Sequence, residues 1–131
     1  MLRRSETKTT RELGRIAEDA VARYLQANGY AILERNFVTA MGEIDIVARH
    51  GPEIVFVEVK SRTSDEIAAP AESVTAAKQS RLIRLAHAYL AAKVQGDIPC
   101  RFDVVEVLIS PQGRVLEISI TRAAFSERSV R

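Results

Sequence analysis

The 131 residues are enough for one domain with a substantial hydrophobic core. Apolar residues make up 47% and charged residues 27%, a balance that excludes a disordered chain. A single cysteine excludes an internal disulfide and a zinc–cysteine cluster, and a net charge of +2 does not by itself indicate nucleic-acid binding.

The first half of the chain is predicted to form a helix followed by three strands. Apolar residues recur every three or four positions over residues 10–28, which is typical of an amphipathic helix. Residues 1–12 carry bases without an apolar run, so we expect a flexible tail rather than a secretory signal, and a cytoplasmic protein. Strands are expected at residues 30–37, 43–49 and 54–62.

The strands over 43–49 and 54–62 are predicted to pair as a hairpin, because the residues between them form a tight His-Gly-Pro turn. In the first of these strands Ile44, Ile46 and Ala48 are expected to share one face, with Asp45 on the other. The second strand is apolar on both faces until Glu58, as a buried central strand would be.

The second half is predicted to add a helix and two more strands. After a polar, proline-containing loop over 64–71, the helix begins at Ser73 or Thr75 and ends near Ala92. Strands follow at 101–109 and 114–121, and residues 123–131 are expected to fray. The sequence therefore predicts one α/β domain over 13–122, a sheet flanked by helices, and no apolar run long enough to cross a membrane.

An acid–lysine pair stands on the central strand. Glu58 and Lys60 are two residues apart, so they point to the same face with Cα atoms roughly 6.5–7 Å apart. The predicted hairpin brings Asp45 beside them. Two carboxylates can bind Mg²⁺ or Mn²⁺, and a lysine can orient or deprotonate the attacking water. The alternative is that Glu58 and Lys60 only form a surface ion pair with each other.

Five segments, GRIAED, GYAILERNF, GEIDIVA, VFVEVKSR and RFDVV, carry a family resemblance. In this order and at these separations they resemble the YraN family of small bacterial proteins, which is similar to restriction endonucleases and Holliday-junction resolvases. The resemblance implies a restriction-endonuclease-like α-β-β-β-α-β core with a mixed central sheet. It implies catalytic roles for Glu18, Asp45, Glu58 and Lys60, with the three acids as metal ligands. Without it Glu18 would be an ordinary helix acid paired with a nearby arginine.

Basic residues near the predicted site indicate a nucleic-acid partner. Lys78, Arg62 and Arg81 are expected to contact a nucleic-acid backbone, or else to be solvated side chains, and Lys78 could simply extend past the core to solvent. The predicted function is a Mg²⁺- or Mn²⁺-dependent nuclease acting on DNA, including branched or recombining DNA. The alternatives are a non-catalytic nucleic-acid-binding module and a protein-interaction domain, and a homodimer is compatible with each.

Three further side chains have structural interpretations. Cys100 is expected to be a small buried residue, and Asp103 either to pair with Arg101 or to lie below the sheet. Glu43 is expected to serve the turn at the start of its strand, with a metal-ligand role as the alternative.

Overall fold

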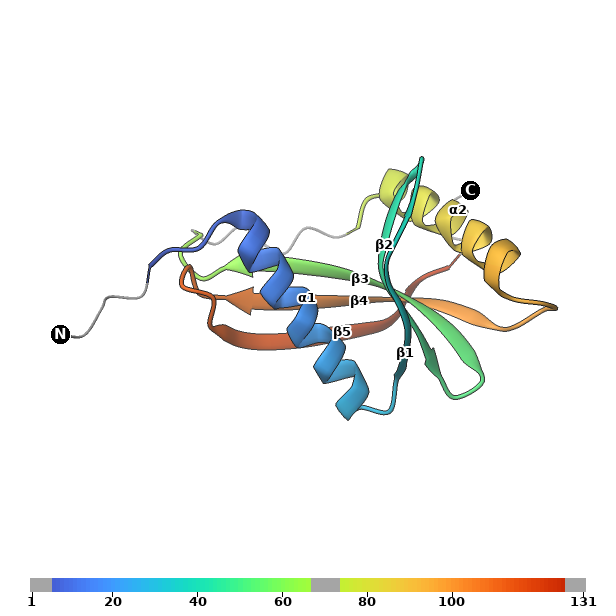
Figure 1. The fold of residues 1–131 in the computed structure, drawn as a ribbon, viewed down its shortest axis with the longest axis horizontal. Helices are drawn as coiled ribbons and strands as arrows, with labels where there is room; N and C mark the ends of the chain where they lie inside the picture. Colours follow the sequence, from blue (N-terminus) through green and yellow to red (C-terminus); the bar gives the residue numbers. More distant parts are fainter. Residues whose placement is uncertain (1–5, 67–73, 127–131) are drawn as a thin grey trace.

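A computed structural model describes residues 6–66 and 74–126 (Figure 1). The predicted order of helices and strands is confirmed. The elements are α1 (Thr10–Ala27), β1 (Ala31–Thr39), β2 (Gly42–His50), β3 (Glu53–Thr63), α2 (Ala76–Lys93), β4 (Cys100–Ile109) and β5 (Val115–Phe125).

The strands form one mixed sheet in the order β1-β2-β3-β4-β5. Neighbouring strands are antiparallel except β3 and β4, which are parallel. A parallel pair requires a crossover connection, and α2 lies in it. In Figure 1 the β1–β2 hairpin runs across the direction of β3, β4 and β5, so the sheet is strongly twisted.

Helix α1 covers one face of the sheet. It begins with a capping box, in which the Thr9 side chain accepts from the Glu12 amide and the Glu12 carboxylate accepts from the Thr9 amide. Its buried stripe packs on side chains from β2, β3 and β4. The stripe comprises Leu13, Ala17, Ala20, Val21, Ala22 and Leu25.

Helix α2 covers the opposite face, so the protein has three layers, helix, sheet and helix (Figure 1). Its buried residues include the predicted stripe of Leu82, Leu85, Ala86 and Tyr89. These pack on aromatic and aliphatic side chains of β2, β3 and β4, with Phe56 at the centre of the sheet face. The predicted α/β fold, with a mixed sheet flanked by helices, is confirmed.

Several boundaries differ from the sequence prediction. Helix α1 begins at Thr10, and the Lys8 amide already donates to the Pro111 carbonyl, so part of the segment expected as a tail belongs to the fold. Strand β5 extends to Phe125, which is buried. Part of the loop expected over 64–71, together with the helix start proposed at Ser73, lies outside the described residues.

Two predictions about individual side chains are wrong. Ile44 packs with the buried side chains that α2 covers, whereas Ile46 and Ala48 pack with those that α1 covers. The reason is that β2 stops pairing with β3 at Ile46, where the β1–β2 hairpin twists away from β3. Cys100 is exposed, because it stands at the very start of β4, before that strand enters the core. Neither helix described by the structure is long and apolar enough to span a membrane.

Candidate functional site

The candidate site lies where β2 separates from β3. The paired positions of these strands end at Ile46 and Val57, one residue before Asp45 and Glu58. Beyond that point a side chain replaces the backbone as the partner of β3, since Asp45 Oδ2 accepts a hydrogen bond from the Val59 amide at 2.8 Å. At the point where the strands separate, the half-buried Asp45 carboxylate therefore lies beside the middle of β3. The predicted hairpin also brings Asp45 to this position.

The environment of Asp45 disfavours its charged form. Burial raises the pKa of this carboxyl, and with the nearby carboxylates of Glu58, Glu18 and Glu43 it brings the pKa to about 7, although the hydrogen bond from Val59 acts in the opposite direction. Such crowding of acids around one half-buried carboxyl is unusual for a purely structural position.

The charge of Glu58 interacts with the charges of three basic side chains. Burial raises its pKa, while the positive charges of Lys78, Lys60 and Arg81 act against this rise. Lys60 comes from the same face of β3, and Lys78 and Arg81 come from the first half of α2. The Glu58 carboxylate therefore interacts with the charges of the two α2 bases as well as with that of Lys60.

Glu18 is close to this group, but its carboxylate is held by β1. Its Oε1 accepts from Arg35 Nε at 3.1 Å and Nη2 at 3.0 Å, and its Oε2 accepts from Asn36 Nδ2 at 3.0 Å. The Glu18 side chain is only 15% exposed. The partner expected from the sequence, a neighbouring arginine of the same helix, is replaced by Arg35 from the adjacent strand.

The predicted acids therefore lie close enough for their charges to interact, but they are not arranged as a complete set of metal ligands. Over residues 6–66 and 74–126, no group of three or more His, Cys, Asp or Glu side chains is arranged to hold a metal ion. Glu18 is not part of such a set because both of its carboxylate oxygens accept hydrogen bonds from Arg35 and Asn36. Asp45 and Glu58 are the two predicted ligands left at the centre.

Lys78 and Arg81, the predicted nucleic-acid contacts on α2, are both exposed at the first turns of the helix. Arg62 is also exposed and follows Lys60 by two residues on the same face of β3. Glu43 is exposed and is the second residue of β2. Its negative charge contributes to the raised pKa of Asp45 and of Glu58.

Sequence reasoning missed Arg35 and Asn36. Asn36 lies inside β1 with a φ of 55°. Asparagine is one of the few residues that tolerate this left-handed conformation. The only signal in the sequence was the Arg-Asn pair inside the segment GYAILERNF, which does not say where the two side chains point.

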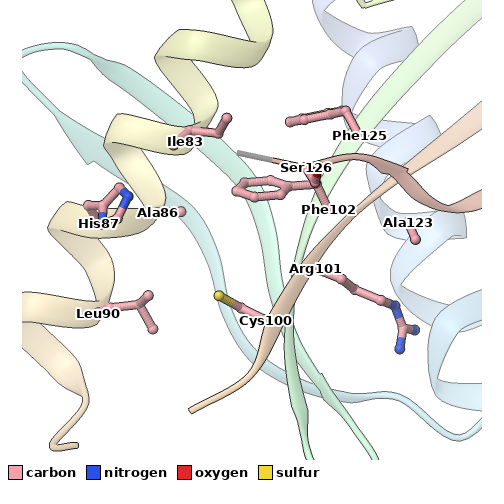
Figure 2. Close-up of a pocket in the computed structure, with 10 residues that line it drawn as sticks. All are labelled: Ile83, Ala86, His87, Leu90, Cys100, Arg101, Phe102, Ala123, Phe125 and Ser126. Atoms are coloured by element: carbon pink, nitrogen blue, oxygen red, sulfur yellow. The ribbon is translucent and has the colours of Figure 1, made fainter. Parts of the chain in front are cut away.

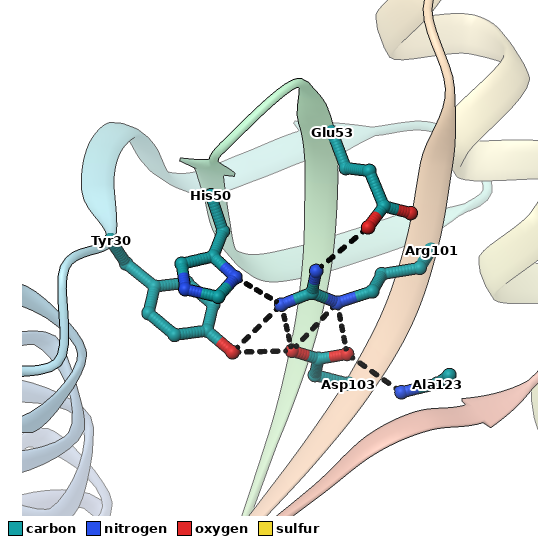
Figure 3. Close-up of polar contacts among 6 residues, drawn as sticks. All are labelled: Tyr30, His50, Glu53, Arg101, Asp103 and Ala123. Atoms are coloured by element: carbon teal, nitrogen blue, oxygen red, sulfur yellow. Dashed lines mark hydrogen bonds and ion pairs between the residues drawn. The ribbon is translucent and has the colours of Figure 1, made fainter.

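A second polar cluster lies away from the acidic group, near the β2–β3 turn (Figure 3). Asp103 is completely buried, and its carboxylate accepts from Tyr30 Oη at 2.8 Å, Arg101 Nε at 3.0 Å and the Ala123 amide at 2.9 Å. Arg101 also donates to Glu53 at 2.9 Å. The predicted Arg101–Asp103 pair is confirmed. The mutual satisfaction of these groups indicates a structural cluster that ties Tyr30, just before β1, and Glu53 of β3 to β4 and β5.

A cavity of about 340 Å³ lies between α2, the start of β4 and the end of β5 (Figure 2). Its walls are largely apolar, with Ile83, Leu90, Phe102 and Phe125 among them, and Cys100 and His87 at its border. None of the predicted site residues lines this cavity.

Comparison with known proteins gives one consistent family. The model of the uncharacterised protein family UPF0102 matches residues 17–107. A UPF0102 protein of Moorella thermoacetica is 47% identical over 119 residues, which cover 91% of this chain and 99% of the relative. One from Symbiobacterium thermophilum is 50% identical over 106 residues (81% and 90%), and one from Nitrosomonas europaea is 49% identical over 114 residues (87% and 93%).

Proposed function

The chain belongs to the uncharacterised protein family UPF0102, and from the geometry of its acidic group we propose that it is a metal-dependent nuclease acting on DNA. The observation that carries the proposal is the half-buried Asp45, held on the Val59 amide beside Glu58, with Lys60 next on the same strand face.

The residues present fit a hard divalent cation such as Mg²⁺ or Mn²⁺. Mg²⁺ is commonly bound by one or two carboxylates, with waters and substrate phosphate oxygens as the remaining ligands. Asp45 and Glu58 supply that number, and their crowding with Glu18 and Glu43 is relieved by a positive charge. A cation bound there would supply an activated water and offset the negative charge that builds on a phosphate under attack.

The chain's own groups have separate tasks in this proposal. Lys60 orients the attacking water or takes its proton, since it projects from the same face of β3 as Glu58. Lys78 and Arg81 neutralise phosphate groups of the DNA backbone beside Glu58, and Arg62 extends the basic surface along β3. Branched and recombining DNA are the substrates to test first, because the family resemblance extends to junction resolvases.

The test is cleavage of linear, nicked and four-way DNA in Mg²⁺ or Mn²⁺. Asp45→Ala and Lys60→Ala should each lower the cleavage rate by about 100-fold or more. Glu117→Ala, which removes an exposed acid on β5, is the matched control and should leave the rate unchanged. Cleavage that persists in both site variants would refute the proposal.

Calorimetry separates binding from turnover. Mn²⁺ should bind the wild type, in the presence of uncleaved DNA if the phosphate supplies ligands, and Glu58→Ala should abolish the heat of binding. Salt-dependent DNA binding without any metal effect would instead support a non-catalytic nucleic-acid-binding module.

A further inference from the structure

The contacts of Glu18 are made by two consecutive residues of one strand. In a regular strand, neighbouring side chains point to opposite faces of the sheet, so Arg35 and Asn36 would not reach the same carboxylate. Here both do, Arg35 with a forked pair of bonds to Oε1 and Asn36 with a bond to Oε2.

The local backbone of β1 explains how this is achieved. Asn36 has a φ of 55°, a left-handed conformation in the middle of a strand, whose cost must be offset by surrounding contacts. The flanking pairs Arg35↔Ile46 and Phe37↔Ile44 place Asn36 across from Asp45. The strained residue therefore lies between the helix acid and the candidate metal ligand.

We propose that Arg35 and Asn36 are positioning residues that hold the Glu18 carboxylate at the edge of the Asp45–Glu58 site, as a fixed outer carboxylate rather than a direct metal ligand. This inference rests on the proposed function. It gives the helix acid a different task from the one implied by the family resemblance, in which Glu18 binds the metal itself.

The physical advantage is a fixed negative charge that needs no metal to stay in place. The guanidinium of Arg35 compensates Glu18 in the absence of a cation, and three hydrogen bonds restrict the carboxylate to one position. Carboxylates of this kind accept hydrogen bonds from the waters of a bound cation, and their loss typically lowers metal affinity 10- to 100-fold.

The experiment is a double-mutant cycle read by calorimetric Mn²⁺ affinity. Asn36→Gly removes the amide while keeping a residue that adopts a positive φ without strain, so the strand is expected to persist. We expect this change to raise the Kd for Mn²⁺ about 10-fold or more. In a Glu18→Gln background the same change should alter Kd less than about 2-fold, because Asn36 acts through the Glu18 carboxylate.

Two controls isolate the positioning role. Asp19→Asn removes the other carboxylate that Arg35 contacts but leaves the bonds to Glu18, so Kd should stay at the wild-type value. Asn28→Gly removes another asparagine side-chain bond, at the distant C-terminus of α1, and should also leave Kd unchanged.

The outcomes are distinct. An unchanged Kd in Asn36→Gly, or an equal change with and without Glu18, overturns the positioning role while leaving the metal site itself in place. Absence of Mn²⁺ binding by the wild type, with and without DNA, overturns both the proposed function and the inference that depends on it.

Discussion

The candidate site depends on the ionisation of a single carboxyl group. Asp45 sits half-buried among other acids with a pKa of about 7, so near neutral pH its charge is sensitive to any cation that arrives. An opposite charge next to such a group favours the ionised form, which links metal binding to proton release.

The raised pKa of Asp45 gives a prediction about stability. Ionisation costs more in the folded state, with a pKa of about 7, than in the unfolded chain, where the ordinary value is 3.8. The cost is therefore absent below about pH 4, grows as the pH rises and is complete above pH 7. Asp45→Asn, which keeps an acceptor for the Val59 amide, should be more stable than wild type at pH 8 by roughly 4 kcal/mol.

Urea unfolding of both proteins from pH 4 to pH 8, with chelator present, measures this difference. Asp45→Ala serves as the comparison, because it also removes the charge but leaves the Val59 amide without its acceptor. Its gain should be smaller by about 1 kcal/mol. A stability difference between Asp45→Asn and wild type that does not change with pH would contradict the assignment.

At the scale of elements, the position of α1 depends on more than its apolar stripe. The turn between β4 and β5 packs against the start of the helix, where the Lys8 amide donates to the Pro111 carbonyl at 2.8 Å. Gly113 in that turn has a φ of 93°, and a Cβ at this position would lie 2.8 Å from Lys8 and 2.9 Å from Ile16. A side chain here would have to displace the ends of the Lys8 and Ile16 side chains.

Gly113→Ala is therefore expected to destabilise the fold through two costs, the left-handed backbone and the contact with α1. Gly51→Ala is the matched control, since that residue also has a positive φ but nothing lies within 4 Å of the added Cβ. The control should lose about 1–2 kcal/mol from the backbone alone, and Gly113→Ala about 1 kcal/mol more. Thermal unfolding of the two variants measures the difference, and equal losses would show that the turn adapts freely.

At the scale of the whole molecule, charge is arranged unevenly although its sum is small. The net charge is +2, yet the α2 bases Lys78 and Arg81 gather beside Glu58 on one side of the sheet. Arg15 and Arg23 lie on the exposed part of α1, which covers the other side. A local basic surface of this kind can contact phosphates even when the total charge is close to neutral.

This arrangement predicts which bases set the salt dependence of DNA binding. The double variant Lys78→Gln/Arg81→Gln should weaken binding and reduce the slope of log K against log salt by about 2, roughly one for each phosphate contact. Arg15→Gln/Arg23→Gln removes the same charge from α1 and should leave the slope near the wild-type value. Fluorescence anisotropy over a salt series distinguishes them, and equal slopes for the two variants would place the DNA elsewhere.

The order of elements and the hairpin that carries Asp45 toward Glu58 could be predicted from the chain alone. Apolar periodicity and turn residues are local properties, so the sequence determines them directly. Local patterns do not report where one strand leaves another, and for that reason Ile44 was assigned to the wrong face.

The state of the site was decided by tertiary structure. The Glu58-Val59-Lys60 triplet and Asp45 could be identified in the sequence. The hydrogen bonds from Arg35 and Asn36 to Glu18 could not, because they depend on a left-handed residue inside a strand. The pKa of Asp45 likewise arises from burial and from charges brought together by three different elements. Sequence alone thus determined which acids the chain carries, and only the packing of α1 against the twisted sheet decided which of them face one another.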